Sequence, residues 1–176
     1  KYEGQTADVI SLASIEVQIG RRLDGIVGLD LFTRYVVEID YVTNEIRLHD
    51  PLTYTYSGAG ESIPLTLRDG HFFVPARIQM PGRPALEGQF LVDTGGVMVT
   101  AVLTTPFSQS HNLPASDQKT ISDNSLSGLG GETRLIISRA TSFTLGNMSI
   151  RAPVVYVSRD TGGALASSDY DGLIGS

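Results

Sequence analysis

The stretch Phe90-Leu-Val-Asp-Thr-Gly-Gly96 carries the most information about the fold of this chain. Its three apolar residues predict the buried end of a strand, and Asp93, Thr94 and Gly95 follow at once. A glycine after the carboxylate and the hydroxyl lets the backbone turn tightly, so that an N–H group can donate to the carboxylate. Asp93 is therefore our candidate catalytic residue, with Thr94 and Gly95 as its supporting loop. A plain strand that ends in a turn has the same sequence, and this alternative stays open.

A second feature is an internal repeat. Asp24-Gly-Ile-Val-Gly28 and Asp171-Gly-Leu-Ile-Gly175 share one pattern, and a β-branched stretch precedes each of them: residues 15–19 and 154–157. Five small and aliphatic residues can coincide by chance. The shared preceding strand favours a duplicated unit instead.

Short β-branched segments dominate the rest of the chain and predict an all-β fold. Alternation predicts a hairpin from strands at 35–41 and 45–49. The central Asp-Gly of Arg68-Asp-Gly-His71 predicts another. Further strands are expected at 63–67, 72–80, 86–92, 134–138, 141–145 and 151–157. Residues 104–127 are polar and rich in turn formers, and the one helix that we predict spans 29–35.

Composition excludes several functions. The 176 residues carry a net charge of −6 without a Lys/Arg run, which argues against nucleic acid or an anionic membrane as the main partner. No apolar run has the length of a membrane span. The absence of cysteine excludes disulfides and thiol nucleophiles. His49, His71 and His111 are dispersed, so we expect no metal site and no cofactor.

The apolar residues before Asp93-Thr-Gly95, followed well downstream by Asp171-Gly-Leu-Ile-Gly175, resemble the retropepsin-like aspartic peptidases. More closely, they look like bacterial aspartyl-protease-like proteins with tandem units. The resemblance implies a retropepsin-like β-barrel with one short helix. It also implies that the second motif braces the aspartate loop, through Gly172, Leu173, Ile174 and Gly175. Gly96 stands where that family usually has Ala or Ser.

The order of the motifs differs from that of one family unit. Residues 25–41, closed by 46–48, look like the helix and hairpin that end a unit, yet they precede Asp93. We therefore expect residues 1–55 to be the C-terminal part of a first unit and residues 56–62 to be a linker. Residues 63–176 are then the N-terminal and middle part of a second unit.

The resemblance implies an aspartic endopeptidase, a hydrolase that cleaves polypeptides through a water activated by paired aspartates. Because only Asp93 is an obvious catalytic carboxylate, the second is expected from an upstream unit or from a homodimer partner. A non-catalytic peptide-binding or interaction module with the same fold is the alternative. The resemblance also suggests a bacterial, extracytoplasmic setting, periplasmic or secreted.

Two further segments bear on the site. A glycine-rich stretch is the candidate flap over the substrate, with Ser127, Gly128, Gly130 and Gly131 as its residues. Asp160-Thr-Gly-Gly163 repeats the letters of Asp93-Thr-Gly-Gly96. The polar residues Ser158 and Arg159 precede it, so we predict a polar loop there and not a second catalytic aspartate.

Overall fold

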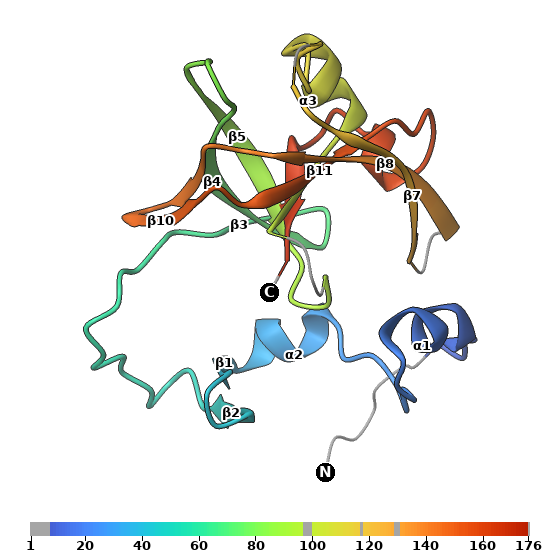
Figure 1. Cartoon of the computed structure of the whole chain (residues 1–176). Coiled ribbons are helices and arrows are strands. Elements are labelled where there is room, and N and C mark those ends of the chain that lie inside the picture. Colours follow the sequence, from blue (N-terminus) through green and yellow to red (C-terminus); the bar gives the residue numbers. More distant parts are fainter. Residues whose placement is uncertain (1–7, 97–99, 117, 129–130, 176) are drawn as a thin grey trace.

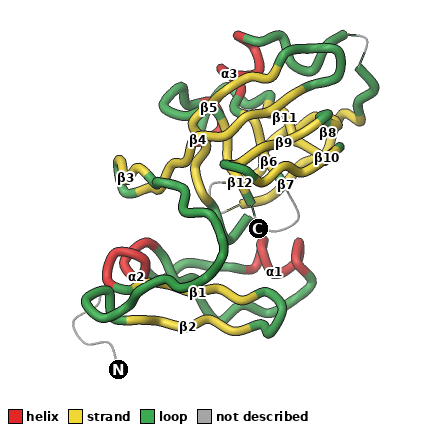
Figure 2. The backbone as a smooth tube through the Cα atoms, turned by 90° about the vertical axis from the view of Figure 1, so that its left-hand side faces the viewer, coloured by secondary structure: helices red, strands yellow, loops and turns green. Residues whose placement is uncertain are grey.

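The computed structural model describes residues 8–96, 100–116, 118–128 and 131–175, with the backbone alone over 122–128 and 131–132. Its strands form a two-stranded sheet near the N-terminus and a ten-stranded sheet in the rest of the chain. Figure 1 shows the large sheet above the two N-terminal helices and the small hairpin. A long connection over residues 50–65, without helix or strand, joins the two parts (Figure 2).

The N-terminal part contains four elements: α1 (Ala13–Ile19), α2 (Leu29–Arg34), β1 (Val36–Asp40) and β2 (Glu45–His49). The β1–β2 hairpin and α2 lie where the sequence predicts them. Among the described residues, none that precedes Phe73 is buried. Ile26 and Val27 in the first copy of the repeat are 55% and 70% exposed.

The large sheet begins with β3 (Thr66–Arg68) and β4 (His71–Gln79), which form the predicted hairpin. Its turn has positive φ at both central residues, 49° at Asp69 and 75° at Gly70, which matches the right-handed twist of the flanking strands. β5 (Ala85–Val92) then pairs antiparallel with β4.

The remaining elements complete the sheet and its cover. They are β6 (Ala101–Leu103), α3 (Thr105–Ser110), β7 (Ile121–Gly128), β8 (Gly131–Arg139), β9 (Ser142–Leu145), β10 (Met148–Arg151), β11 (Val154–Ser158), η1 (Ala164–Ala166) and β12 (Gly172–Ile174). The strand order is β10-β9-β4-β5-β12-β6-β11-β8-β7. The three-residue β12 lies between β5 and β6, parallel to the first and antiparallel to the second.

The hydrophobic core lies within the large sheet. Phe90 is fully buried and meets Phe143 edge-on, with 5.3 Å between the ring centroids. Around it pack buried side chains of β4, β6 and β11, among them Val74, Ile78, Leu103, Val155 and Val157. Because Phe90 stands three residues before Asp93, the core fixes the strand that carries the candidate catalytic residue.

The all-β fold expected from the sequence is confirmed, with corrections. Residues 15–19 form helix α1 and not a strand. The Leu12 carbonyl accepts the N–H groups of Ile15 and Glu16, and Gly20 ends the helix at φ 67°. Such local bonds outweigh the preference of β-branched residues for strands, which depends strongly on context.

Three α-helices are described where one was predicted. α3 lies in the stretch expected to be polar turns, and Thr104 caps it by accepting the N–H of Phe107, with proline in its first turn. The predicted barrel is not closed within the described part of the chain, since β10 and β7 end the strand order without pairing to each other. No helix among the described residues is long and apolar enough to cross a membrane.

Candidate active site

Asp93 stands directly after β5, where the adjacent strand β12 also ends. Leu91 faces Leu173 and Val92 faces Ile174 across the parallel pair. The ladder continues by one bond into the loop, because the N–H of Asp93 donates to the carbonyl oxygen of Ile174 at 2.9 Å. The backbone of the candidate catalytic residue is therefore held by β12, as the resemblance implies.

The loop after Asp93 orients the carboxylate. The N–H of Gly95 donates to Oδ1 of Asp93 at 3.0 Å, and the N–H of Gly96 donates to its carbonyl oxygen at 3.0 Å. The Asp93 residue is half-buried, while Thr94 and Gly95 are exposed. One carboxylate oxygen is thus fixed by the backbone at an accessible position.

Glycine at position 96 keeps this loop close to β12. A methyl group there would lie 3.2 Å from the Asp93 carbonyl oxygen, 3.3 Å from Oδ2 and 3.4 Å from Cα of Gly175. These contacts are tight, so alanine at this position would press on the Asp93 backbone, on one oxygen of its carboxyl group and on Gly175. Glycine at position 96 thus lets this loop lie close to Gly175.

Gly172 begins β12 in a place that admits no side chain. An added Cβ atom would lie 2.5 Å from the carbonyl oxygen of Val102 and 2.8 Å from the ring of Phe90. The strand therefore fits between β5 and β6 only with glycine here.

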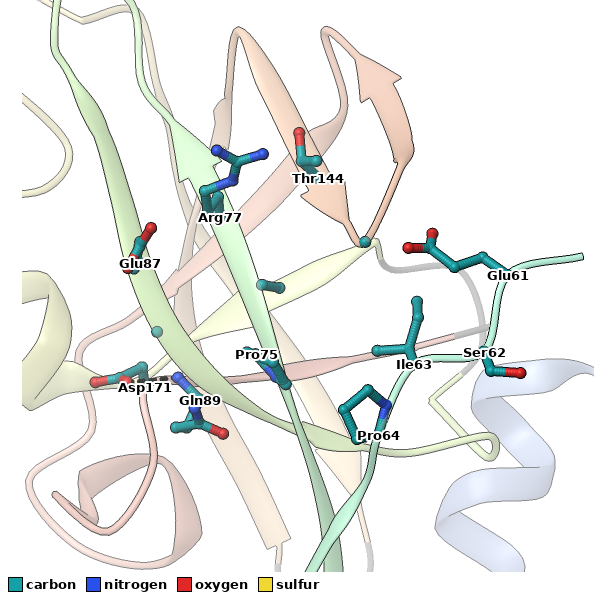
Figure 3. Close-up of a pocket in the computed structure, with 13 residues that line it drawn as sticks. Glu61, Ser62, Ile63, Pro64, Pro75, Arg77, Glu87, Gln89, Thr144 and Asp171 are labelled. Carbon is teal, nitrogen blue, oxygen red and sulfur yellow. Dashed lines mark hydrogen bonds between the residues drawn. The ribbon is translucent and has the colours of Figure 1, made fainter.

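The residue before it, Asp171, was not among the predicted site residues. Its Oδ2 accepts the N–H of Gln89 at 2.7 Å, the contact that Figure 3 marks between them. The recurrence of this aspartate as Asp24 in the repeat was the available signal.

Asp160 lies elsewhere. Its Oδ1 accepts the N–H of Arg134 at 3.0 Å, and its Oδ2 accepts the hydroxyl of Thr133. Both partners belong to β8. The Asp160 side chain therefore contacts a hairpin strand, whereas Asp93 is joined to β12 through its backbone N–H.

The candidate flap falls at the tip of the β7–β8 hairpin. Ser127 and Gly128 end β7, and Gly131 begins β8 opposite Gly128. Gly130 lies outside the described residues.

A groove of about 550 Å³ opens on the outer face of β4 and β5 (Figure 3). The residues that line it include Arg77 on β4, Glu87 on β5, Glu61 on the connection between the two parts, and Asp171. Asp93 does not line it. Within the described ranges, no group of three or more His, Asp or Glu side chains is placed to hold a metal ion.

The solved structures that are similar to this chain include two proteases. A retropepsin-like aspartic protease from Rickettsia conorii aligns with 68% of this chain and 85% of its own, at 23% identity and a TM-score of 0.46. EIAV protease in complex with the inhibitor HBY-793 aligns with 69% of this chain and 88% of its own, at 17% identity and a TM-score of 0.39. No family model and no curated protein matches the sequence.

Proposed function

We propose that this chain provides one catalytic aspartate, Asp93, of an aspartic endopeptidase. The observation that carries the proposal is the set of backbone bonds at the end of β5. The N–H of Gly95 donates to the carboxylate, and Asp93 donates its own N–H to β12. A carboxylate that is oriented by the backbone and still accessible suits proton transfer to and from a water molecule.

The proposed chemistry needs a second aspartate beside the first. Two carboxyl groups roughly 3 Å apart share one proton, because both cannot ionise at that distance. The ionised group removes a proton from water, which attacks the scissile carbonyl. The protonated group donates to the developing oxyanion, and no covalent intermediate forms.

The second carboxylate comes from a preceding unit of the same fold or from a second copy of this chain. In support of the first source, we assign residues 1–55 to the end of such a unit, residues 56–62 to a linker and residues 63–176 to the next unit. The small separate sheet and the lack of buried residues among those described before Phe73 agree with this division. An extended polypeptide is the substrate, added as a strand beneath the β7–β8 hairpin.

The test is cleavage of an unfolded protein between about pH 3 and pH 7. The matched variants are Asp93→Asn and Asp160→Asn, which change the same residue in two identical four-residue stretches. Cleavage that Asp93→Asn abolishes and Asp160→Asn retains supports the assignment. Equal activity of the wild type and Asp93→Asn overturns it.

The same assay on a protein extended upstream through a complete preceding unit distinguishes the two sources of the second carboxylate. Cleavage by this chain, together with a doubled mass in sedimentation equilibrium, indicates a homodimer. Cleavage by the extended protein as a monomer indicates the tandem arrangement. Absence of cleavage by both overturns the peptidase proposal in favour of a peptide-binding module.

A further inference from the structure

We propose that Asp171 is the positioning residue that sets the register of β12 and thereby the position of Asp93; this inference rests on the function proposed above. Asp171 lies at the opposite end of β12 from the aspartate loop. Three residues separate it from Gly175, a distance of roughly 13 Å along an extended strand.

Asp171 attaches the start of β12 to both neighbouring segments. Its N–H donates to the Gln89 carbonyl at 2.8 Å, and its own carbonyl accepts the N–H of Thr104 at 3.0 Å. Its carboxylate adds a third bond, from the Gln89 N–H at 2.7 Å. Because a charged acceptor forms a stronger bond than a neutral one, this side chain fastens β12 to β5 at one residue.

The space for this carboxylate depends on a glycine of β5. A Cβ atom at Gly88 would lie 2.9 Å from Cβ of Asp171 and 3.0 Å from its Oδ2. Figure 3 shows Asp171 and Gln89 side by side at the strand crossing. The sequence thus supplies both the acceptor, the carboxylate of Asp171, and the space for it, which the missing side chain of Gly88 leaves open.

A strand of three residues needs such a fixed point. A slip by one residue would move the side chain of Leu173, and likewise that of Ile174, to the other face of the sheet from the one it now occupies. It would also move the carbonyl of Ile174 away from the N–H of Asp93, which it now accepts at 2.9 Å. The position of the catalytic carboxylate therefore depends on the bond between Asp171 and Gln89.

The experiment compares Asp171→Ala, Asp171→Asn and Asp24→Ala in the full chain. Asp24 occupies the same place in the first copy of the repeat and pairs in the open with Arg22, so it is the matched control. The first measurement is hydrogen exchange of the Asp93 and Gly95 amides by NMR, which requires no enzymatic activity. We expect Asp171→Ala to accelerate exchange at Asp93 about tenfold, because its N–H donates to Ile174 and local opening of β12 exposes it. Gly95 donates to the Asp93 carboxylate on an exposed loop, so its exchange should change less. Asp171→Asn, which keeps an acceptor oxygen, restores most of the protection.

The second measurement is the kinetics of peptide cleavage. We expect Asp171→Ala to lower kcat by roughly tenfold or more with KM changed less than about twofold, because the carboxylate is displaced while the binding strands remain. A merely structural role predicts equal loss at all folded amides and no separation of kcat from KM. Should Asp171→Ala fail to fold, Asp171→Ser replaces it, with a shorter acceptor.

Unchanged exchange at Asp93 in a folded Asp171→Ala variant overturns the inference, and so does an equal effect of Asp24→Ala. If neither this chain nor the protein extended upstream cleaves peptides, the proposed function fails, while the exchange measurement still tests the role of Asp171.

Discussion

The two copies of the Asp-Gly-aliphatic-aliphatic-Gly motif have nearly the same sequence and opposite surroundings. Gly172–Ile174 form β12 between two strands of the large sheet. Gly25, Ile26 and Val27 belong to no strand, and both aliphatic side chains are more than half exposed. The motif therefore does not make a strand by itself. It becomes one where two neighbouring strands offer it a gap that only glycine can enter.

The two copies should differ most in how much a glycine-to-alanine substitution lowers the free energy of unfolding. Gly172→Ala places Cβ 2.5 Å from the Val102 carbonyl, so that β12 or β6 must move. We expect the free energy of unfolding to fall by about 3 kcal/mol, the upper part of the usual range for overpacking. Urea unfolding measures it.

The control is Gly25→Ala, where nothing lies within 4 Å of the added atom. A change within about 0.5 kcal/mol is expected there. Equal losses at positions 172 and 25 would show that the first motif also occupies a closed gap.

Much of the fold could be predicted because it follows from local rules. Alternating residues located the β1–β2 hairpin, and Asp69-Gly70 located the β3–β4 turn through its need for positive φ. The loop at Asp93 could be predicted in the same way, since three apolar residues before it and a glycine within it are a local signal in the sequence. Its contact with β12 followed from the family resemblance and not from periodicity.

What the residue pattern missed depends on distant partners. β6 and β12 have three residues each, too few to show a period, and long-range pairing defines them. Asp171 was overlooked because its importance comes from Gln89, which lies on another strand. α1 was misread because its ends are fixed by backbone bonds at Leu12 and Gly20 that hydrophobic periodicity does not report.

A smaller difference in stability is expected when a threonine is replaced in α2, which follows the first motif, or at the N-terminal cap of α3, which contacts the second. Thr104, fully buried, contacts the Asp171 and Tyr170 carbonyls with its hydroxyl at 3.3 Å and caps α3. Thr104→Val removes the cap and these contacts, so we expect a loss of about 1–2 kcal/mol in the free energy of unfolding.

Thr33→Val in α2 is the matched control for Thr104→Val. Its hydroxyl donates to the Asp30 carbonyl at 3.1 Å on an exposed surface. Water replaces that bond, and the expected change is within about 0.5 kcal/mol. Thermal unfolding of both variants measures the difference. A Thr33 variant as destabilised as the Thr104 variant would mean that α2 is as firmly packed as α3.

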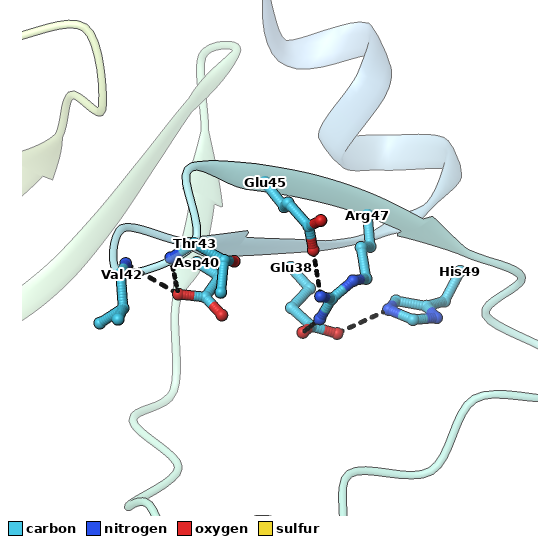
Figure 4. A network of polar contacts seen from close by, with 7 residues as sticks. All are labelled: Glu38, Asp40, Val42, Thr43, Glu45, Arg47 and His49. Atoms are coloured by element: carbon cyan, nitrogen blue, oxygen red, sulfur yellow. Dashed lines mark hydrogen bonds and ion pairs between the residues drawn. The ribbon is translucent and has the colours of Figure 1, made fainter.

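The smallest effect concerns the hairpin after the first motif, where exposed polar contacts take the place of a core (Figure 4). Glu38 accepts from Arg47 at 2.7 Å and lies 2.8 Å from Nε2 of His49. These hydrogen bonds, first that of His49 and then that of Arg47, hold the pKa of Glu38 below its ordinary value of 4.5. Since the lowered pKa belongs to the folded hairpin, the contacts stabilise it above pH 4.5 and are lost as the pH falls through that lowered pKa.

Glu38→Gln should therefore weaken the hairpin near neutral pH and make no difference in strong acid. The Hα chemical shifts of Val37 and Leu48, which face each other across β1 and β2, measure its population. The difference in hairpin population between wild type and variant should be small, because the network is exposed. It should become smaller still in 0.5 M salt. A difference in population that persists below pH 3 would mean that packing, and not charge, stabilises this hairpin.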